Sequence, residues 1–178
     1  MNILVTVLGV LGTVSMIIAS LVKGRNMKTI LFFVFFGNVL AATSYFLGDG
    51  GINGAASCYI GGVQTLINYL FDSKNKPLPK WLVVVYALSF IGINIYVGAV
   101  IEMKFYLVAL AIIASLTFIM CIGQKTGAKY RFWTLFNFVL WGIYDALSGA
   151  WEVLVTVHVP LFIFTVAGMI VHDRKKTE

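Results

Sequence analysis

Residues 24–50 of the chain are GRNMKTILFFVFFGNVLAATSYFLGDG, and residues 123–149 are GQKTGAKYRFWTLFNFVLWGIYDALSG. In each stretch a basic segment leads into an apolar run that contains one Asn and one Tyr at matching places. Two segments of this length with so apolar a composition share roughly two or three identical residues by chance. A shift of 99 positions aligns five of the 27 pairs: Gly24 with Gly123, Phe33 with Phe132, Asn38 with Asn137, Tyr45 with Tyr144, and Gly50 with Gly149.

The composition of the whole chain shows in what environment such a repeat folds. Of the 178 residues, 60% are hydrophobic and 11% are charged, and the mean hydropathy is +0.94. Soluble domains have about 45–50% apolar and about 25% charged residues. This chain has too little charge to cover a water-facing surface, which excludes soluble globular, disordered, collagen-like and disulfide-framework proteins. We expect a polytopic membrane protein in a lipid bilayer.

Seven apolar runs are long enough to cross the hydrocarbon core, which takes about 20 residues. Segments rich in Gly, Pro or charge separate them, and the weakest boundary lies between the sixth and seventh runs. The first run has its basic residues after it rather than before it, so we expect a retained span and not a cleaved signal peptide. The predicted spans are 2–22, 29–48, 52–71, 81–101, 105–123, 131–149 and 153–171.

The basic residues predict the orientation of these spans. Twelve of the thirteen Lys and Arg lie in the 1–2, 3–4 and 5–6 loops and the C-terminal tail, and the exception is Lys104. The positive-inside rule then places the N-terminus outside and the C-terminus in the cytoplasm. The same clustering argues against nucleic-acid binding, because no segment combines a basic face with interleaved aromatic residues.

The repeat predicts how the spans are arranged. The 99-residue shift places spans 1–3 on spans 5–7 and leaves span 4 as a connector that restores the orientation. The predicted fold is therefore an all-α integral membrane protein with seven transmembrane helices in a parallel 3+1+3 repeat. Its parts are a first three-helix repeat (1–72), a basic loop and connector helix (73–102), and a second three-helix repeat with a cytoplasmic tail (103–178).

Polar residues inside spans are costly in hydrocarbon and usually face the bundle interior. Helical spacing puts Asn38 and Tyr45 on one face of span 2, and Asn137, Trp141 and Tyr144 on the equivalent face of span 6. The amides suit either hydrogen bonds to a solute or bonds that hold helices together. The tyrosines suit a solute site or an aromatic belt at the membrane interface.

The remaining polar residues also leave two interpretations open. Gln64 and Asn68 share one face of span 3, where two amides suit either the hydroxyl or heterocycle edge of a solute or helix packing. Asp145, about one turn from the outer end of its span, either reaches water or acts as a binding or coupling carboxylate. His158, which is turned by about 160° from the face of Pro160, is either a proton carrier or a packing residue.

No catalytic or cofactor motif occurs in the sequence: CxxC, HExxH, P-loop and GxSxG patterns are all absent. The two cysteines, Cys58 and Cys121, lie inside apolar runs, where a thiol behaves as a small hydrophobic group. We therefore expect a protein that is not an enzyme and that uses no cofactor or metal.

Several short motifs resemble those of the bacterial inner-membrane YgjV family across about residues 5–172. They are Asn38-x6-Tyr45, Gly50-x3-Gly54-Ala55, Gly61 or Gly62, Leu66, Tyr69, Lys76-Pro77 and, in the second half, Trp141-Gly142-Ile143-Tyr144-Asp145-Ala146-Leu147-Ser148-Gly149. The resemblance implies a multi-pass transporter of the bacterial cytoplasmic membrane, because that family is grouped with the SWEET, PnuC and PQ-loop proteins, which share a 3+1+3 fold. The YgjV family itself has no settled substrate.

The chain also departs from those relatives. It has no Pro-Gln dipeptide, no proline in spans 1, 2, 5 and 6, and no Trp-x3-Trp motif, so sugar and nicotinamide-riboside specificities do not transfer to it. We expect an energy-independent facilitator for a small, neutral, polar organic solute, with a non-transporting membrane receptor or binding protein as the alternative. A homo-oligomer stays open. The expected solute contacts are Asn38, Gln64, Asn68, Asn137, Trp141, Tyr144 and Asp145.

Overall fold

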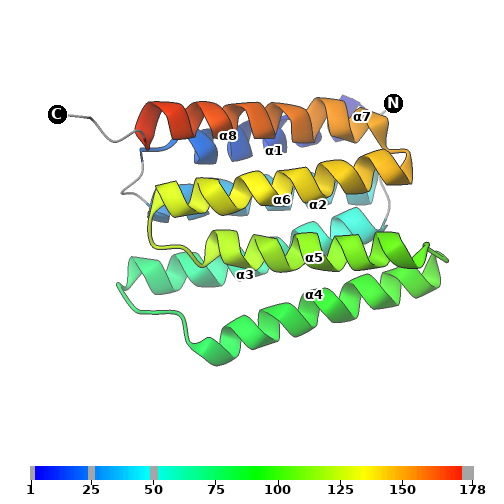
Figure 1. The fold of residues 1–178 in the computed structure, drawn as a ribbon, viewed down its shortest axis with the longest axis horizontal. Helices are drawn as coiled ribbons and strands as arrows, with labels where there is room; N and C mark the ends of the chain where they lie inside the picture. Colours follow the sequence, from blue (N-terminus) through cyan, green and yellow to red (C-terminus); the bar gives the residue numbers. More distant parts are fainter. Residues whose placement is uncertain (1–2, 24–26, 49–51, 174–178) are drawn as a thin grey trace.

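The structure is a computed structural model, and it describes residues 3–23, 27–48 and 52–173. All regular secondary structure in these residues is helical (Figure 1). The last three elements, α7, the π-helix η1 and α8, follow one another without a break and form one continuous rod. The helices are α1 (Ile3–Leu21), α2 (Met27–Leu47), α3 (Ile52–Ser73), α4 (Lys80–Val100), α5 (Phe105–Ile122), α6 (Gly127–Ser148), α7 (Trp151–Val153), η1 (Leu154–His158) and α8 (Val159–His172).

Five of these helical rods are long and apolar enough to cross a membrane, which indicates a membrane protein. They are α1, α2, α4, α5 and the rod from Trp151 to His172. Helices α3 and α6 have 22 residues each but are the least apolar of the long helices. The predicted seven runs thus appear as seven rods, five of which meet the criteria for a span.

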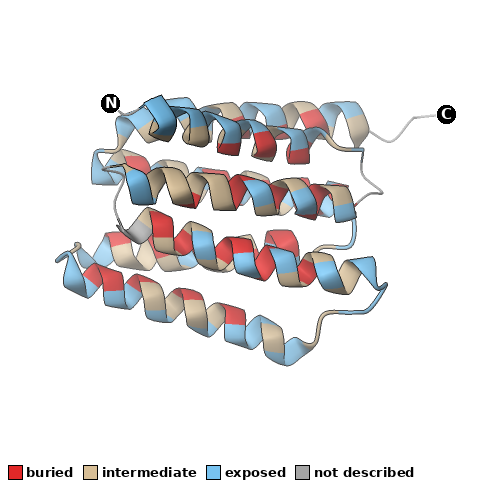
Figure 2. Cartoon of the chain, turned by 180° about the vertical axis from the view of Figure 1, so that it is seen from behind, coloured by how far each residue is buried: buried red, intermediate tan, exposed pale blue. Residues whose placement is uncertain are grey.

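The surface of the bundle is apolar on every long helix. Large hydrophobic side chains are exposed on α3, such as Val63 and Leu70, and on α6, such as Phe136 and Ile143, as well as on the five more apolar rods. Buried positions lie on the faces that the helices turn toward one another (Figure 2). Soluble monomers rarely expose apolar patches of this extent, so the outer surface suits contact with lipid.

Helix α6 begins four residues earlier than the predicted span at 131, because a cap and an ion pair bring its polar start into the helix. The side chain of Thr126 is the N-cap and accepts a hydrogen bond from the backbone N–H of Lys129. Arg131, which the sequence placed at the boundary, is fully buried within the helix. The prediction from charge alone therefore placed the start of this helix too late.

The helices form two layers, with α4, α5, α6 and α8 in front of α1, α2 and α3 in Figure 1. Helix α2 packs between α1 and α3, and α6 packs between α5 and α8. The group of helices α1–α3 meets the group α5–α8 where α1 contacts α8 and where α3 contacts α5. Helix α4 packs at the edge, against α3 and α5.

The two ends of the bundle differ in their connections. The C-terminal ends of α1, α3, α5 and α8 lie at one end of the bundle, and the N-terminal ends of α1, α3 and α5 lie at the other (Figure 1). At the end of the bundle where α1, α3, α5 and α8 finish, buried apolar residues from α1, α2, α5 and α6 form what we call the end cluster: Ala19, Met27, Ile30, Leu31, Val34, Cys121, Ile122 and Tyr130.

A buried arginine joins three helices beside the end cluster. The guanidinium of Arg131 donates to both carboxylate oxygens of Asp173, with Nε···Oδ2 at 2.8 Å and Nη2···Oδ1 at 2.5 Å. Its Nη1 donates to the carbonyl oxygens of Ser20 at 3.3 Å and Val22 at 2.9 Å, at the end of α1. Because a bidentate arginine–carboxylate pair fixes both distance and orientation, this network holds α1, α6 and the end of α8 together.

Candidate functional site

A cavity of about 560 Å³ lies in the middle of the bundle, and every long helix contributes to its lining. Small-molecule sites have volumes of about 300–1,000 Å³ and apolar walls with a few polar groups. This cavity has the same character, because aromatic and aliphatic side chains surround a small set of amide, hydroxyl and ionisable groups.

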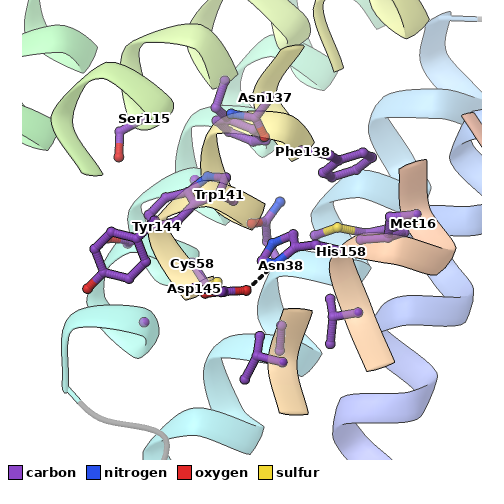
Figure 3. A pocket seen from close by; sticks show the side chains of 18 of the residues that line it. Met16, Asn38, Cys58, Ser115, Asn137, Phe138, Trp141, Tyr144, Asp145 and His158 are labelled. Carbon is purple, nitrogen blue, oxygen red and sulfur yellow. Dashed lines mark hydrogen bonds and ion pairs between the residues drawn. The ribbon is translucent and has the colours of Figure 1, made fainter. Parts of the chain in front are cut away.

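Five of the seven predicted contact residues line the cavity (Figure 3). They come from α2 and α6: Asn38, Asn137, Trp141, Tyr144 and Asp145. Tyr45, which the repeat pairs with Tyr144, lines it as well. The residues that the 99-residue shift aligns, an asparagine and a tyrosine from each half of the chain, thus meet around one space.

The two asparagines are held by the main chain in a way that leaves their oxygens available. Asn38 Nδ2 donates to the carbonyl of Val34 at 2.9 Å, and Asn137 Nδ2 donates to the carbonyl of Ala114 at 2.7 Å. Among the described residues, neither amide oxygen accepts a hydrogen bond. Each amide therefore takes part in packing and also offers an acceptor to a solute.

Gln64 and Asn68 lie outside the cavity, in contacts that tie α3 to α4 and α5. Asn68 Nδ2 donates to the carbonyl of Ile122 at 2.9 Å, and its Oδ1 accepts a hydrogen bond from the Tyr86 hydroxyl at 3.1 Å. Gln64 Nε2 donates to the Tyr86 carbonyl at 3.4 Å. Helix α3 reaches the cavity instead through the residues that precede this pair: Gly54, Ser57, Cys58 and Gly61.

Asp145 and His158 form an ion pair on the wall of the cavity. The distance from His158 Nδ1 to Asp145 Oδ2 is 2.5 Å, and the contact is drawn as the dashed line in Figure 3. Asp145 is only 5% exposed. The sequence identified both residues but did not bring them together, because no periodicity relates a residue on span 6 to one on span 7.

The backbone that carries His158 is unusual. Residues Leu154–His158 form a π-helix, in which the N–H of Val159 donates to the carbonyl of Leu154. Pro160 lies two residues after His158, and a proline removes one helical hydrogen bond and clashes with the preceding turn, which a wider turn accommodates. The sequence turned His158 away from the face of Pro160, and in the structure His158 lines the cavity while Pro160 does not.

Two further groups in the lining were not singled out as solute contacts from the sequence. The Ser57 hydroxyl oxygen is buried and has no hydrogen-bond partner among the described residues. Cys58, the neighbouring residue, is partly buried and also lines the cavity. The spacing of Gly54, Ser57, Cys58 and Gly61 (i, i+3, i+4, i+7) is the signal that marks this face of α3.

The two ends of the cavity have different surroundings. One end reaches the connections between α4 and α5 and between α6 and α7, through Ile101, Met103 and Ala150. The other end reaches Tyr130 and Cys121, which belong to the end cluster. The lining therefore extends to the connections at one end of the bundle and to packed core at the other.

Comparison of the chain with protein-family models, with curated proteins and with solved structures finds no match. The resemblance to the YgjV family stays a prediction, and the case for a function rests on the site itself.

Proposed function

We propose that the chain is a transporter of the bacterial inner membrane that carries a small polar organic solute through the central cavity. The observation that carries this proposal is the position of the residues paired by the internal repeat. Asn38 and Tyr45 from α2, and Asn137 and Tyr144 from α6, line one cavity. Duplicated halves that meet around a polar site are the common plan of secondary transporters.

In the proposed arrangement, α1–α3 and α5–α8 are parallel repeats and α4 is the connector. The packing supports this, because α2 and α6 are each the middle helix of their group, and because α1 contacts α8 while α3 contacts α5. Such reciprocal contacts are expected of a two-fold axis along the membrane normal. Helices α3 and α6 would also span the membrane, with their polar faces toward the cavity and their exposed apolar faces toward lipid.

The proposed orientation places the N-terminus outside and the C-terminus in the cytoplasm, as the distribution of Lys and Arg favours. The end cluster and the Arg131–Asp173 network then lie on the cytoplasmic side. In alternating access, a single state opens to one side only, so this end would be the closed gate of an outward-facing state. Rocking of one repeat against the other would open it.

A membrane receptor with a solute pocket is the alternative, since a cavity that approaches one end of the bundle also fits a protein that binds without transport. Uptake by proteoliposomes, screened with vitamins, sugars, nucleosides and amines, separates the two functions. A transporter gives uptake of at least one compound that empty liposomes do not accumulate. A receptor gives saturable binding of a compound in detergent but no uptake.

Matched variants connect the uptake to the cavity. In Asn137→Leu the solute loses a hydrogen bond, and uptake at low concentration should fall by roughly two- to tenfold. The control is Asn94→Leu, which removes a buried amide of α4 that donates to Phe90 and Ser115 and does not line the cavity. Equal losses in the two variants would contradict a solute role for Asn137.

A further inference from the structure

The charge balance of the cavity depends on one pair of residues. Among the described residues that line it, Asp145 is the only carboxylate, and the lining contains no lysine or arginine. A buried carboxylate is strongly disfavoured unless a cation or proton accompanies it. His158 is its partner, with Nδ1 at 2.5 Å from Oδ2, and the pair has no net charge when it holds one proton.

No other group around this pair carries a positive charge that could balance the carboxylate of Asp145. The titratable residues that face it are Tyr45 from α2, Cys58 from α3 and Tyr144 from α6, and phenols and thiols are neutral at pH 7. Helix α1 contributes only uncharged residues to the lining. A solute that takes the place of the proton therefore has to bring a positive charge.

Two further polar groups of the cavity offer acceptors to a solute. The amide nitrogens of Asn38 and Asn137 donate to main-chain carbonyls, which leaves the two amide oxygens for a donor on the solute. The rings of Trp141 and Tyr144 stand edge to face, with centroids 5.3 Å apart. A carboxylate, free carbonyl oxygens and aromatic faces together favour an organic cation, whereas an anion would be repelled by Asp145 and would find His158 already paired.

We propose that the solute is a small organic monocation, and that its binding at Asp145 displaces the proton that Asp145 shares with His158. The inference rests on the proposed function and replaces the expected neutral solute. In the empty site the imidazolium of His158 pairs with the carboxylate of Asp145. When the cation binds the carboxylate, His158 becomes neutral and its proton leaves to water, so one positive charge enters the site and one leaves.

The test compares cations with neutral molecules of the same shape on the purified full-length protein in detergent. Choline is paired with 3,3-dimethylbutan-1-ol, and benzylammonium is paired with benzyl alcohol. We expect at least one cation to raise the melting temperature in a saturable way while its neutral partner does not. In weakly buffered solution near pH 7, a pH indicator should report release of protons, up to one for each cation bound, because the shared proton is displaced.

Variants test whether the bound cation and the displaced proton share Asp145. Asp145→Asn should weaken binding of the cation by roughly ten- to hundredfold, since it removes a charged hydrogen-bond acceptor. In His158→Gln the buried Asp145 carboxyl has lost its partner and holds the proton itself, so binding of the cation should still release a proton, whereas Asp145→Asn should release none. Glu152→Gln is the control, because Glu152 is an exposed acid near the same end of the bundle and lies outside the lining. It should bind and release protons as the wild type does.

Three results would overturn the inference: neither cation binds, the neutral partners bind as tightly as the cations, or Asp145→Asn releases a proton when a cation binds. The comparison of isosteres uses the wild-type protein alone, so it decides the matter even where Asp145→Asn does not fold. Uptake of an uncharged solute by proteoliposomes of both the wild type and Asp145→Asn would leave the transporter proposal standing and refute the cation. Absence of all uptake, together with binding of a cation, would refute the transporter proposal and leave the cation proposal standing.

Discussion

Gly168 on α8 lies against the end of α1, and replacing it with alanine tests that contact. A Cβ at this position would lie 2.3 Å from the carbonyl oxygen of Ser20 and 3.1 Å from Cδ of Arg131. Neither atom can move freely. The Ser20 carbonyl belongs to the backbone of α1 and accepts a hydrogen bond from Arg131, whose guanidinium is fixed by Asp173.

The magnitude follows from two opposing terms. Forcing a methyl group into a packed site costs about 1–3 kcal/mol, and a backbone contact this short belongs at the upper end of that range. Replacing a helical glycine with alanine returns about 1 kcal/mol of helix propensity. The net loss is about 2 kcal/mol, which lowers the melting temperature of a chain of this size by about 4–8 °C.

The matched control is Gly92→Ala on α4, where a Cβ would meet no atom within 4 Å. This variant gains helix propensity without a clash, so its melting temperature should stay the same or rise. The assay is thermal unfolding of both purified variants in the same detergent, followed by tryptophan fluorescence. Equal melting temperatures for the two variants would refute the close approach of α8 to α1.

Three further variants and a fusion test other parts of the structure. Asn68→Leu should reduce stability by about 0.6 kcal/mol for each lost interhelical bond and leave solute uptake unchanged; a selective loss of uptake would place Asn68 in the site. Arg131→Gln strands the carboxylate of Asp173 and should cost about 3–5 kcal/mol, whereas the further change Asp173→Asn should recover part of that loss in thermal unfolding; no recovery would argue against the pair. Gly149→Ala places alanine at φ +82° in open space and should cost about 1–2 kcal/mol from backbone strain alone, so an unchanged melting temperature would contradict that conformation. An alkaline phosphatase fused to the C-terminus should be inactive, and its activity would reverse the proposed orientation.

Hydropathy and punctuation predicted the helices well because each run has to be about as long as the membrane is thick. The start of α6 was placed late, since Lys129 and Arg131 look like loop residues in the sequence. In the structure, the Thr126 cap and the pairing of Arg131 with Asp173 allow those charges to be helical. Asp173 is 42 residues away, so no local pattern could reveal the pair.

Helical periodicity also predicted which face of α2 and α6 turns inward, and the cavity is lined by those faces. It predicted Gln64 and Asn68 as the contacts from α3, whereas the cavity meets that helix earlier, at Ser57. Tyr86 of α4 draws the two amides into interhelical hydrogen bonds, and the sequence carries no sign of this neighbour. For the same reason it did not reveal that Asp145 meets His158.

Access to the cavity from the two sides of the membrane tests the transport mechanism most directly, and Cys58 provides a native probe. In a Cys121→Ala variant, Cys58 is the only cysteine, and it lies on the cavity wall. A membrane-impermeant methanethiosulfonate reagent is applied to the outside of spheroplasts and, separately, to inverted vesicles. Alternating access predicts that Cys58 reacts from both sides, because each state exposes the cavity in turn. Reaction from one side alone, with or without solute, would contradict transport and leave a pocket that only binds.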